Sequence, residues 1–281
     1  MAIYVPSIAA PYLLKEIDKR LVIGKLADNI TDDVPDIEWQ GSAITFPTYT
    51  RVAVASVVEV KGSVTANEIS GDSTSATINH VAAAVKWHQD TLRTSGRVLA
   101  NMGLKDLADA MALKLDADLT TTAYENATLK SATAAADAIT QTEVENALAL
   151  FGDKQNADEF LGILINSKLF SSFLGMDAFT SESKTYTTSG AGIVTGQIVG
   201  FYRGIPVRLT DNANRPTVSG TAECKTIVLK KGGLAYALKK AIEFVEQYNN
   251  TTFYTTVTAD TYAAQKVVDT SKVAVIAKTI V

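Results

Sequence analysis

Cysteine and histidine are almost missing from this chain of 281 residues. Cys224 is the only cysteine, so an internal disulfide and a zinc cluster built on several thiolates are excluded. The only histidines are His80 and His88, and an extended strand would hold them about 26 Å apart, too far to share a metal ion. We therefore expect no metal site, and a reducing compartment such as the cytoplasm suits the chain.

Long apolar runs and an excess of positive charge are missing too. No run of about 18 apolar residues occurs, so the sequence predicts no membrane-spanning helix, and residues 1–10 lack the basic leader of a secretory signal. The formal net charge of −4 offers no electrostatic basis for tight phosphate binding. An exported protein, a membrane protein and a dedicated nucleic-acid binder are thus disfavoured.

What is present is the composition of a folded chain. Hydrophobic residues make up 47% and charged residues 20%, which excludes a disordered protein. At about 150 residues per domain, the length predicts one or two domains.

Two strand-like stretches flank a polar segment early in the chain. Residues 43–60 and 76–87 are rich in β-branched and aromatic residues, and residues 62–75 between them are mostly small and polar. This order predicts a long β-hairpin, preceded by a modest amphipathic helix within residues 11–30. Because so long a hairpin is not stable alone, we expect it to lie on another surface, of this chain or of a neighbour.

The strongest helical pattern runs from residue 95 to residue 122. Its apolar stripe, with spacings of three and four, consists of Leu104, Leu107, Ala108, Met111, Leu115 and Leu119. The charged residues expected off the stripe are Asp106, Asp109, Lys114 and Asp116. At 1.5 Å per residue the helix would be about 40 Å long, a rod that can support a sheet along its length.

A block of mixed helices and strands follows. Thr142-Glu143-Val144-Glu145 predicts a capping box that starts a short helix, and Gly152 predicts its end. Residues 160–166 form a compact apolar run suited to a buried strand, and Ser167 is the expected cap of the next helix.

Strands dominate the rest of the chain. Residues 198–209 predict a strand pair that turns at Arg203-Gly204, and residues 226–229 predict another strand. Three further strands are expected at residues 251–259, 262–268 and 273–281. We expect these last strands to pair with the hairpin region, so that the mixed block is inserted into a domain built from both ends of the chain.

Glycine spacing gives only a weak hint of a cofactor site. The glycines concerned are Gly190, Gly192, Gly196, Gly200 and Gly204. The first three approach a dinucleotide-binding fingerprint, but one spacing is a residue too long. The last four glycines are spaced four residues apart, as in helices that pack together in a membrane. The polar residues Gln197 and Arg203 lie among them, which argues against an apolar membrane segment. Turn glycines are the preferred interpretation.

The other candidates for chemistry are close carboxylates, a group of lysines and the single thiol. They are Asp32 with Asp33, Glu143 with Glu145, Lys230, Lys231, Lys239, Lys240 and Cys224. A general acid–base pair is one interpretation of the carboxylates, and solvated or dipole-complementing groups are the preferred one. The lysines are expected on a solvated face or at a contact between subunits. Cys224 would act as a nucleophile only if a histidine approached it in the fold.

The order of parts and several short stretches resemble the major capsid proteins of one group of tailed bacteriophages, which have the Hong Kong 97-type fold. The stretches are ITFPTYT at 44–50, LKDLA at 104–108, KLDADL at 114–119, GFYRGIPV at 200–207 and YAAQKVVD at 262–269. The resemblance implies an α+β fold with an N-terminal arm, an extended β-hairpin loop, a long spine helix, a peripheral domain and an inserted mixed α/β axial domain.

Under this resemblance the chain divides into five parts. They are an arm at 1–40, the extended loop with peripheral strands at 41–87, the spine helix with the peripheral domain at 88–139, the axial domain at 140–248 and the returning peripheral strands at 249–281. The short segment before the hairpin leaves no room for a fused scaffolding domain. Lys61 near the hairpin tip is not enough to imply the covalent crosslinking that some family members show.

The function that the resemblance implies is structural. We expect a non-enzymatic subunit, without catalytic, cofactor-binding or metal-binding residues, that self-assembles through hexamers and pentamers into an icosahedral capsid. The capsid would enclose double-stranded DNA through weak, non-specific contacts, in the virion and, during assembly, in the host cytoplasm. Scaffolding, portal and decoration proteins are further partners that the resemblance allows. No membrane partner is expected.

Two alternatives stay open at this point. The first is the shell subunit of an encapsulin-type nanocompartment, which would hold protein cargo in place of a genome. The second is a cytoplasmic α/β enzyme that uses the mixed block, although the sequence shows no convergent polar cluster for it.

Overall fold

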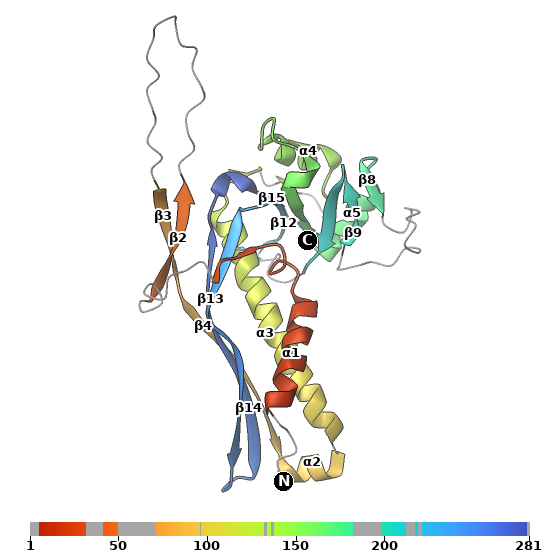
Figure 1. Cartoon of the computed structure of the whole chain (residues 1–281). Helices are drawn as coiled ribbons and strands as arrows, with labels where there is room; N and C mark the ends of the chain where they lie inside the picture. Colours follow the sequence, from red (N-terminus) through yellow and green to blue (C-terminus); the bar gives the residue numbers. More distant parts are fainter. Residues whose placement is uncertain are drawn as a thin grey trace, which may run out of the picture.

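The structure is a computed structural model that describes residues 6–31, 42–49, 71–95, 97–131, 134–135, 138–181, 198–211, 217–218 and 221–279. Within these residues the strands form three sheets. A long ribbon-like sheet runs beside two helices, a larger sheet forms a second body with short helices, and a hairpin projects from the first sheet (Figure 1). The fold therefore mixes helices and several sheets.

The ribbon-like sheet has four strands in the order β1-β13-β14-β4. They are β1 (Asp28–Asn29), β13 (Leu234–Asn249), β14 (Tyr254–Val267) and β4 (Asn79–His88). The strands β13 and β14 form a long antiparallel hairpin, and β4 pairs antiparallel with β14 from Asn79 to His88. Segments from both halves of the chain thus build one sheet.

Helices cover one face of this sheet. They are α1 (Pro6–Arg20), α2 (Gln89–Ser95) and α3 (Arg97–Asn126). All six predicted stripe residues of α3 are buried, and most of them pack with Leu13 and Ile17 of α1 and with Val257 of β14. At 30 residues, α3 is about 45 Å long, so the prediction of a supporting rod is confirmed.

The second body contains a nine-stranded sheet. Its main path is β5-β15-β12-β7-β10-β9-β8, and β6 and β11 pair with β15 and β12. The strands are β5 (Leu129–Lys130), β6 (Ala134–Ala135), β7 (Phe160–Ile165), β8 (Phe179–Ser181), β9 (Ile198–Tyr202), β10 (Ile205–Leu209), β11 (Thr217–Val218), β12 (Thr221–Lys230) and β15 (Val273–Thr279).

Short helices pack on that sheet. They are α4 (Gln141–Ala149), α5 (Phe170–Leu174) and the 3-10 turns η3 (Ala157–Glu159), η4 (Ser167–Leu169) and η6 (Thr270–Lys272). The apolar core includes Leu148 of α4, Phe173 of α5 and Ile163 of β7. The strand pair β9–β10 turns at Arg203 and Gly204, as predicted. Both residues have positive φ, which is typical of a two-residue hairpin turn.

The projecting hairpin differs from the predicted one. The strand β2 (Ala43–Tyr49) pairs with β3 (Gly71–Thr77), whereas residues 79–88 leave the hairpin and pair with β14. Of the predicted partner strand at 76–87, Ala76 and Thr77 do pair with β2, but the prediction was wrong for residues 79–87 because β14 offers β4 a complete antiparallel ladder. Residues 50–70 lie outside the described part of the chain. The base of the hairpin is held by Ile44 and Phe46, which are buried against the ribbon.

Two other pairing expectations need correction. The prediction that residues 273–281 join the hairpin region is wrong, because β15 pairs along its length with β12 in the nine-stranded sheet. The long strand β13 was not predicted, and it places residues 234–249 in the ribbon. The predicted strands 251–259 and 262–268 are one continuous strand, β14.

The predicted helix caps are each shifted. The capping box of α4 is formed by Thr140 and Glu143, so Thr142 lies inside the helix. Asn166, in place of Ser167, caps the next turn by accepting a hydrogen bond from the Lys168 amide. The amphipathic helix expected within residues 11–30 occupies Pro6–Arg20 and ends before the short strand β1.

Candidate functional site

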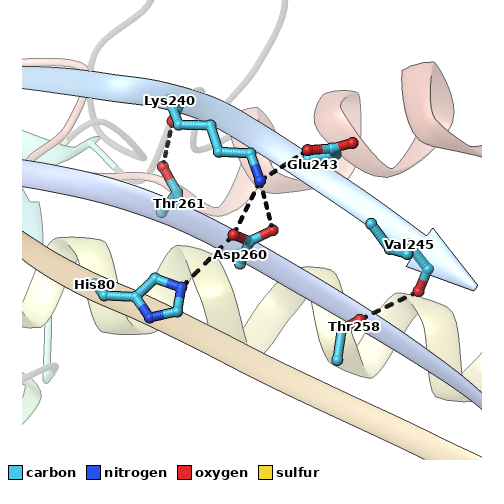
Figure 2. A network of polar contacts seen from close by, with 7 residues as sticks. All are labelled: His80, Lys240, Glu243, Val245, Thr258, Asp260 and Thr261. Atoms are coloured by element: carbon cyan, nitrogen blue, oxygen red, sulfur yellow. Dashed lines mark hydrogen bonds and ion pairs between the residues drawn. The ribbon is translucent and has the colours of Figure 1, made fainter.

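A polar cluster joins three strands of the ribbon where the pairing of β13 is irregular (Figure 2). The register of β13 against β14 shifts on both sides of Lys240. The Lys240 ammonium lies 3.0 and 3.2 Å from the two Asp260 carboxylate oxygens and 2.7 Å from Glu243. Hydrogen bonds to Glu243 and Asp260 raise the pKa of Lys240, so this side chain is a stable cation at the bulge.

His80 completes the cluster from β4. Its ring stacks on Tyr262 with centroids 4.4 Å apart, and its Nε2 lies 3.6 Å from the Asp260 carboxylate. The Thr261 hydroxyl donates to the Lys240 carbonyl at 2.7 Å, replacing a ladder bond that the bulge interrupts. Nearby acids and bases are paired with one another here, so the arrangement fastens strands together and offers no open coordination site.

The turn between β13 and β14 presents aromatic side chains to solvent. We call residues 248–254 the aromatic turn; its exposed rings are Tyr248, Phe253 and Tyr254. Asn249 accepts hydrogen bonds from the amides of Thr251 and Thr252 at 2.9 and 3.2 Å. The turn is thus held in a defined shape. Its rings stay partly exposed, although His88 packs edge-on against Phe253 and Tyr254 and the Lys86 ammonium lies over the Tyr254 ring.

Phe253 is held in a strained conformation within this turn. Its φ of 54° lies in the left-handed region, which a bulky residue rarely adopts. The Gln89 amide donates to the Phe253 carbonyl at 3.0 Å and ties the turn to the start of α2. Despite this strain the ring is 55% exposed, so burial within the chain does not explain its position.

A second apolar surface lies between α1 and α3. We call it the helix groove; it has a volume of about 500 Å³ and is lined by Tyr12, Leu13, Val98, Asn101, Met102, Leu104 and Lys105. Tyr12, Val98 and Met102 are 58%, 66% and 60% exposed. Leu13 and Leu104 are buried at its base. Within the described part of the chain, the groove therefore has a buried apolar floor and an exposed rim that is mainly apolar.

Asp116 corrects a prediction about α3. It was expected on the polar side of the helix, but it is only 2% exposed. Its carboxylate accepts hydrogen bonds from the amides of Val22 and Gly24 at 2.7 and 2.9 Å, which anchors the turn after α1. Burial raises the pKa of Asp116, and the backbone hydrogen bonds only partly oppose that shift.

The two glutamates proposed as a pair face different cations. Glu143 contacts the buried ammonium of Lys278 in β15, and Glu145 accepts from Arg203 at 2.8 Å. Burial raises the pKa of Glu143, but hydrogen bonds from Lys278 and Thr140 outweigh it, and the pKa lies below its ordinary value. These carboxylates are structural anchors of α4.

The four lysines are not one basic patch. Lys230 is buried, contacts the Lys154 carbonyl and Glu159, and lies over the Phe160 ring at 4.6 Å. Lys240 belongs to the ribbon cluster. Lys231 and Lys239 are exposed. The expected solvated basic face is therefore wrong for Lys230.

The remaining candidates are dispersed. Cys224 is buried in the nine-stranded sheet, whereas His80 and His88 both belong to β4 in the ribbon, so no histidine of this chain serves it. Gly200 packs against Phe179, where an added Cβ would lie 2.4 Å from the ring. Gly190, Gly192, Gly196, Asp32, Asp33 and Lys61 lie outside the described residues.

The described part of the chain brings no set of polar groups together for catalysis. Among the described residues, no three His, Cys, Asp or Glu side chains are grouped to hold a metal ion. No described helix has the length and apolar character needed to cross a membrane. The described residues present instead two partly exposed surfaces that are largely apolar, the aromatic turn and the helix groove, neither of which was predicted.

Comparison with solved structures identifies the fold. A structure from Mycobacterium phage Che8 has a TM-score of 0.64 at 14% identity, covering 91% of this chain and 90% of that chain. The capsid of Ralstonia phage GP4 has a TM-score of 0.63 at 11% identity, covering 86% of this chain and 84% of that chain. The chain has the Hong Kong 97-type capsid fold. No protein-family model and no curated protein matches the sequence.

This capsid fold is shared with a protein compartment. The holo-SrpI encapsulin complex from Synechococcus elongatus has a TM-score of 0.54 at 12% identity, covering 74% of this chain and 77% of that chain. The similar structures thus include both kinds of shell protein that the sequence analysis considered, phage capsids and an encapsulin. The phage structures match more of the chain. The predicted capsid fold is confirmed at the level of the whole chain.

Proposed function

We propose that this protein is the structural subunit of an icosahedral phage capsid that encloses double-stranded DNA. The observation that carries the proposal is the likeness to a solved phage capsid over 86% of the chain. A capsid subunit needs surfaces that copies of itself can cover, and the described residues present such surfaces on projecting elements. No single residue would carry the function.

Assembly would supply burial that the lone chain lacks. The exposed rings of the aromatic turn and the rim of the helix groove are apolar surfaces of the kind that mark interaction sites. Repeated contacts of this kind add up in a closed shell, and closure stops heterologous contacts from forming open filaments. Leu13 and Ile17 of α1 are buried on α3 of the same chain, so only the outer face of α1 is left to contact a neighbouring subunit.

The five-part division is part of this proposal, with a changed boundary. The ribbon with α3 would be the peripheral domain, and the nine-stranded body would be the axial domain predicted at 140–248. Because β13 pairs with β14, the boundary would move from residue 248 to about residue 233, and β15 would belong to the axial body.

An encapsulin-type shell is the second candidate, favoured by the SrpI likeness. The two shells differ in content and not in subunit fold. Particles purified from infected or expressing cells would contain nuclease-protected DNA in the first case and a protein cargo in the second.

The first experiment is to express the full chain and examine it by light scattering and negative-stain electron microscopy. Closed particles of megadalton mass are expected. A stable species near the chain mass of 29.9 kDa at high concentration would overturn the proposal and favour an enzyme or another monomeric role.

The projecting hairpin provides a deletion test. Replacing residues 51–69 with Asn-Gly closes β2 and β3 with a two-residue turn, and β2, β3 and the buried Phe46 stay in place. We expect a soluble, folded subunit that no longer forms closed particles, measured by sedimentation velocity. Deleting residues 184–195, which lie between β8 and β9 in the sequence, is the matched control and should leave more assembly than the hairpin deletion. Normal particles from the 51–69 variant would remove the extended loop from the mechanism.

A further inference from the structure

We infer that His88 is a pH-sensitive cap, which holds the first turn of α2 at neutral pH and releases it in mild acid. His88 is the last residue of β4 and directly precedes α2. The helix α2 in turn leads into α3, so it joins the ribbon to the long helix (Figure 1). A change at this cap therefore acts on the connection between two main elements of the fold.

The cap is a hydrogen bond that only the neutral ring can accept. The Asp90 amide donates to His88 Nδ1 at 3.2 Å, so in this state Nδ1 carries no hydrogen. A side-chain acceptor just before a helix satisfies an amide of the first turn, which has no partner inside the helix. Protonation turns both ring nitrogens into donors, and the Nδ1–H would then face the Asp90 N–H. The cap is thus lost when the ring takes up a proton.

A second partner lies within reach of the charged ring. The Asp90 carboxylate is 3.4 Å from the same Nδ1, and it can accept the hydrogen that the Asp90 amide cannot. Protonation therefore exchanges a bond to the backbone of α2 for a bond to a side chain. The new ion pair is weak, because the Asp90 side chain is 77% exposed. It also leaves the backbone amide of the first turn without its acceptor.

The other described groups around His88 are two rings and a cation. Tyr254 of β14 packs edge-on against the imidazole with centroids 5.0 Å apart, and Phe253 does so at 6.5 Å. The Lys86 ammonium lies 5.5 Å from the centroid of the same Tyr254 ring, so it brings a second positive charge to this end of β4. A cation at the start of a helix is also disfavoured by the helix dipole. The exposed Asp90 carboxylate is therefore opposed by a neighbouring cation and by the dipole.

The release is limited in extent, because two other bonds that hold α2 on the ribbon do not titrate. The Gln89 amide donates to the Phe253 carbonyl at 3.0 Å, and the Gln89 side chain donates to the Thr255 hydroxyl at 3.4 Å. We therefore expect residues 90–95 to fray in acid while the rest of the fold stays intact. Histidine is the side chain that ordinarily changes its charge between about pH 5 and pH 8, so this is the range in which the cap opens.

Hydrogen exchange with mass spectrometry tests the cap in the full chain, kept unassembled by dilution. After correction for the intrinsic pH dependence of exchange, the protection of residues 90–95 should fall about threefold or more between about pH 7.5 and about pH 5.5. His88→Asn is the decisive variant, because asparagine caps helices well and does not titrate. Its residues 90–95 should keep the same protection at both pH values.

His80→Asn is the matched control. It removes the other histidine of the chain from the same strand, where the ring faces Asp260 of β14. The loss of protection in acid should be as large in this variant as in the wild type. Asp90→Asn keeps the amide donor and removes the acceptor of the charged ring, so it should move the midpoint of the loss to lower pH.

Equal protection of the wild type at both pH values would refute the cap, and so would a loss of the same size in His88→Asn. If His88→Asn does not fold, the wild-type imidazoles decide. The chain has two histidines, so ¹³C-labelled rings give two NMR signals, and His80→Asn identifies that of His88. Its titration midpoint has to match the midpoint of the protection loss, and a mismatch would refute the cap. The inference concerns a single chain, so it and the capsid role can fail independently.

Discussion

Asp116 is a buried charge that acts through the backbone it binds. It lies on the long helix α3 and accepts hydrogen bonds from the amides of Val22 and Gly24 in the turn after α1. An added Cβ at Gly24 would lie 3.5 Å from the carboxylate and 3.1 Å from Leu21, so the turn fits closely around it. Asp116 thus holds the turn that follows α1 against the long helix α3.

Removal of the Asp116 carboxylate should therefore be costly. In Asp116→Ala two buried amides lose their acceptor, and we expect a loss of about 2–4 kcal/mol in the free energy of unfolding. The measurement is urea denaturation of the unassembled subunit. Asp118→Ala is the control on the same helix, because it removes only the exposed i,i+4 pair with Lys114 and should cost about 0.5 kcal/mol or less. Equal losses in both variants would show that Asp116 is no anchor.

The raised pKa of Asp116 gives a prediction with a definite sign. Burial raises the pKa above the ordinary value of 3.8, so the folded chain holds this proton more tightly than the unfolded chain does. The contribution of the group is therefore greatest at acid pH and falls as pH rises through the folded-state pKa. Asp116→Asn cannot titrate, and the stability difference between wild type and this variant should shrink from acid to neutral pH in denaturation curves. A difference that grows instead would contradict the raised pKa.

The position of Asp116 was within reach of sequence reasoning. Counting in steps of four from Leu104 gives Ala108, Ala112, Asp116 and Thr120, and all are buried. The narrow stripe used for prediction treated charge as a sign of exposure. A carboxylate at a core position of the pattern indicates a buried group with a backbone partner, but the partner itself, a turn 92 to 94 residues earlier, is set by tertiary packing.

One carboxylate, that of Asp260, holds the bulge in the ribbon together. Asp260 binds Lys240 and faces His80, so it joins three strands at the point where the β13 register shifts (Figure 2). Asp260→Ala should lower the local protection of residues 238–243 by about two- to fivefold, equivalent to about 0.5–1 kcal/mol after allowance for partial exposure. Hydrogen exchange with mass spectrometry measures this.

Thr258→Ala is the matched control for that experiment. Thr258 also lies on β14 and donates to the Val245 carbonyl at 3.2 Å, but it lies outside the bulge. Its loss should leave residues 238–243 unchanged. If both variants exchange alike, the ion cluster does not hold the bulge.

The elements differ in how far local sequence predicts them. The helix α3 was predicted well because its apolar period is long and regular, and β7 was predicted because it is a compact apolar run. The strand β13 was missed because LAYALKKAIEFVEQYN is rich in helix-forming residues. Its pairing with β14 overrides that preference, and such a partner is visible only in the fold.

At the scale of the whole molecule, charge predicts weak contact with the proposed genome. The chain carries 26 basic and 30 acidic residues, and the described lysines at 230 and 240 are engaged in ion pairs. We expect the unassembled subunit to bind duplex DNA with a dissociation constant weaker than about 100 µM at physiological salt. Fluorescence anisotropy with labelled DNA measures this, and tight, salt-dependent binding would contradict a passive container.

The candidate surfaces were the least predictable part of the whole molecule. The sequence motifs led to the fold, but Tyr12, Val98 and Phe253 look like ordinary apolar residues until the fold leaves them uncovered. Exposure depends on the packing of all elements together. Residue patterns alone therefore could not distinguish these side chains from core residues.

The order of the strands along the chain also determines when the two sheets can form during synthesis. The strand β4 (Asn79–His88) pairs with β14 (Tyr254–Val267), and β12 needs β15, which follows the whole of β14. A nascent chain on the ribosome must therefore wait, with both bodies unfinished, until nearly all of it has emerged. The apolar faces and strand edges of both unfinished sheets stay exposed during this time, so nascent chains on neighbouring ribosomes are prone to associate until their last strands have emerged.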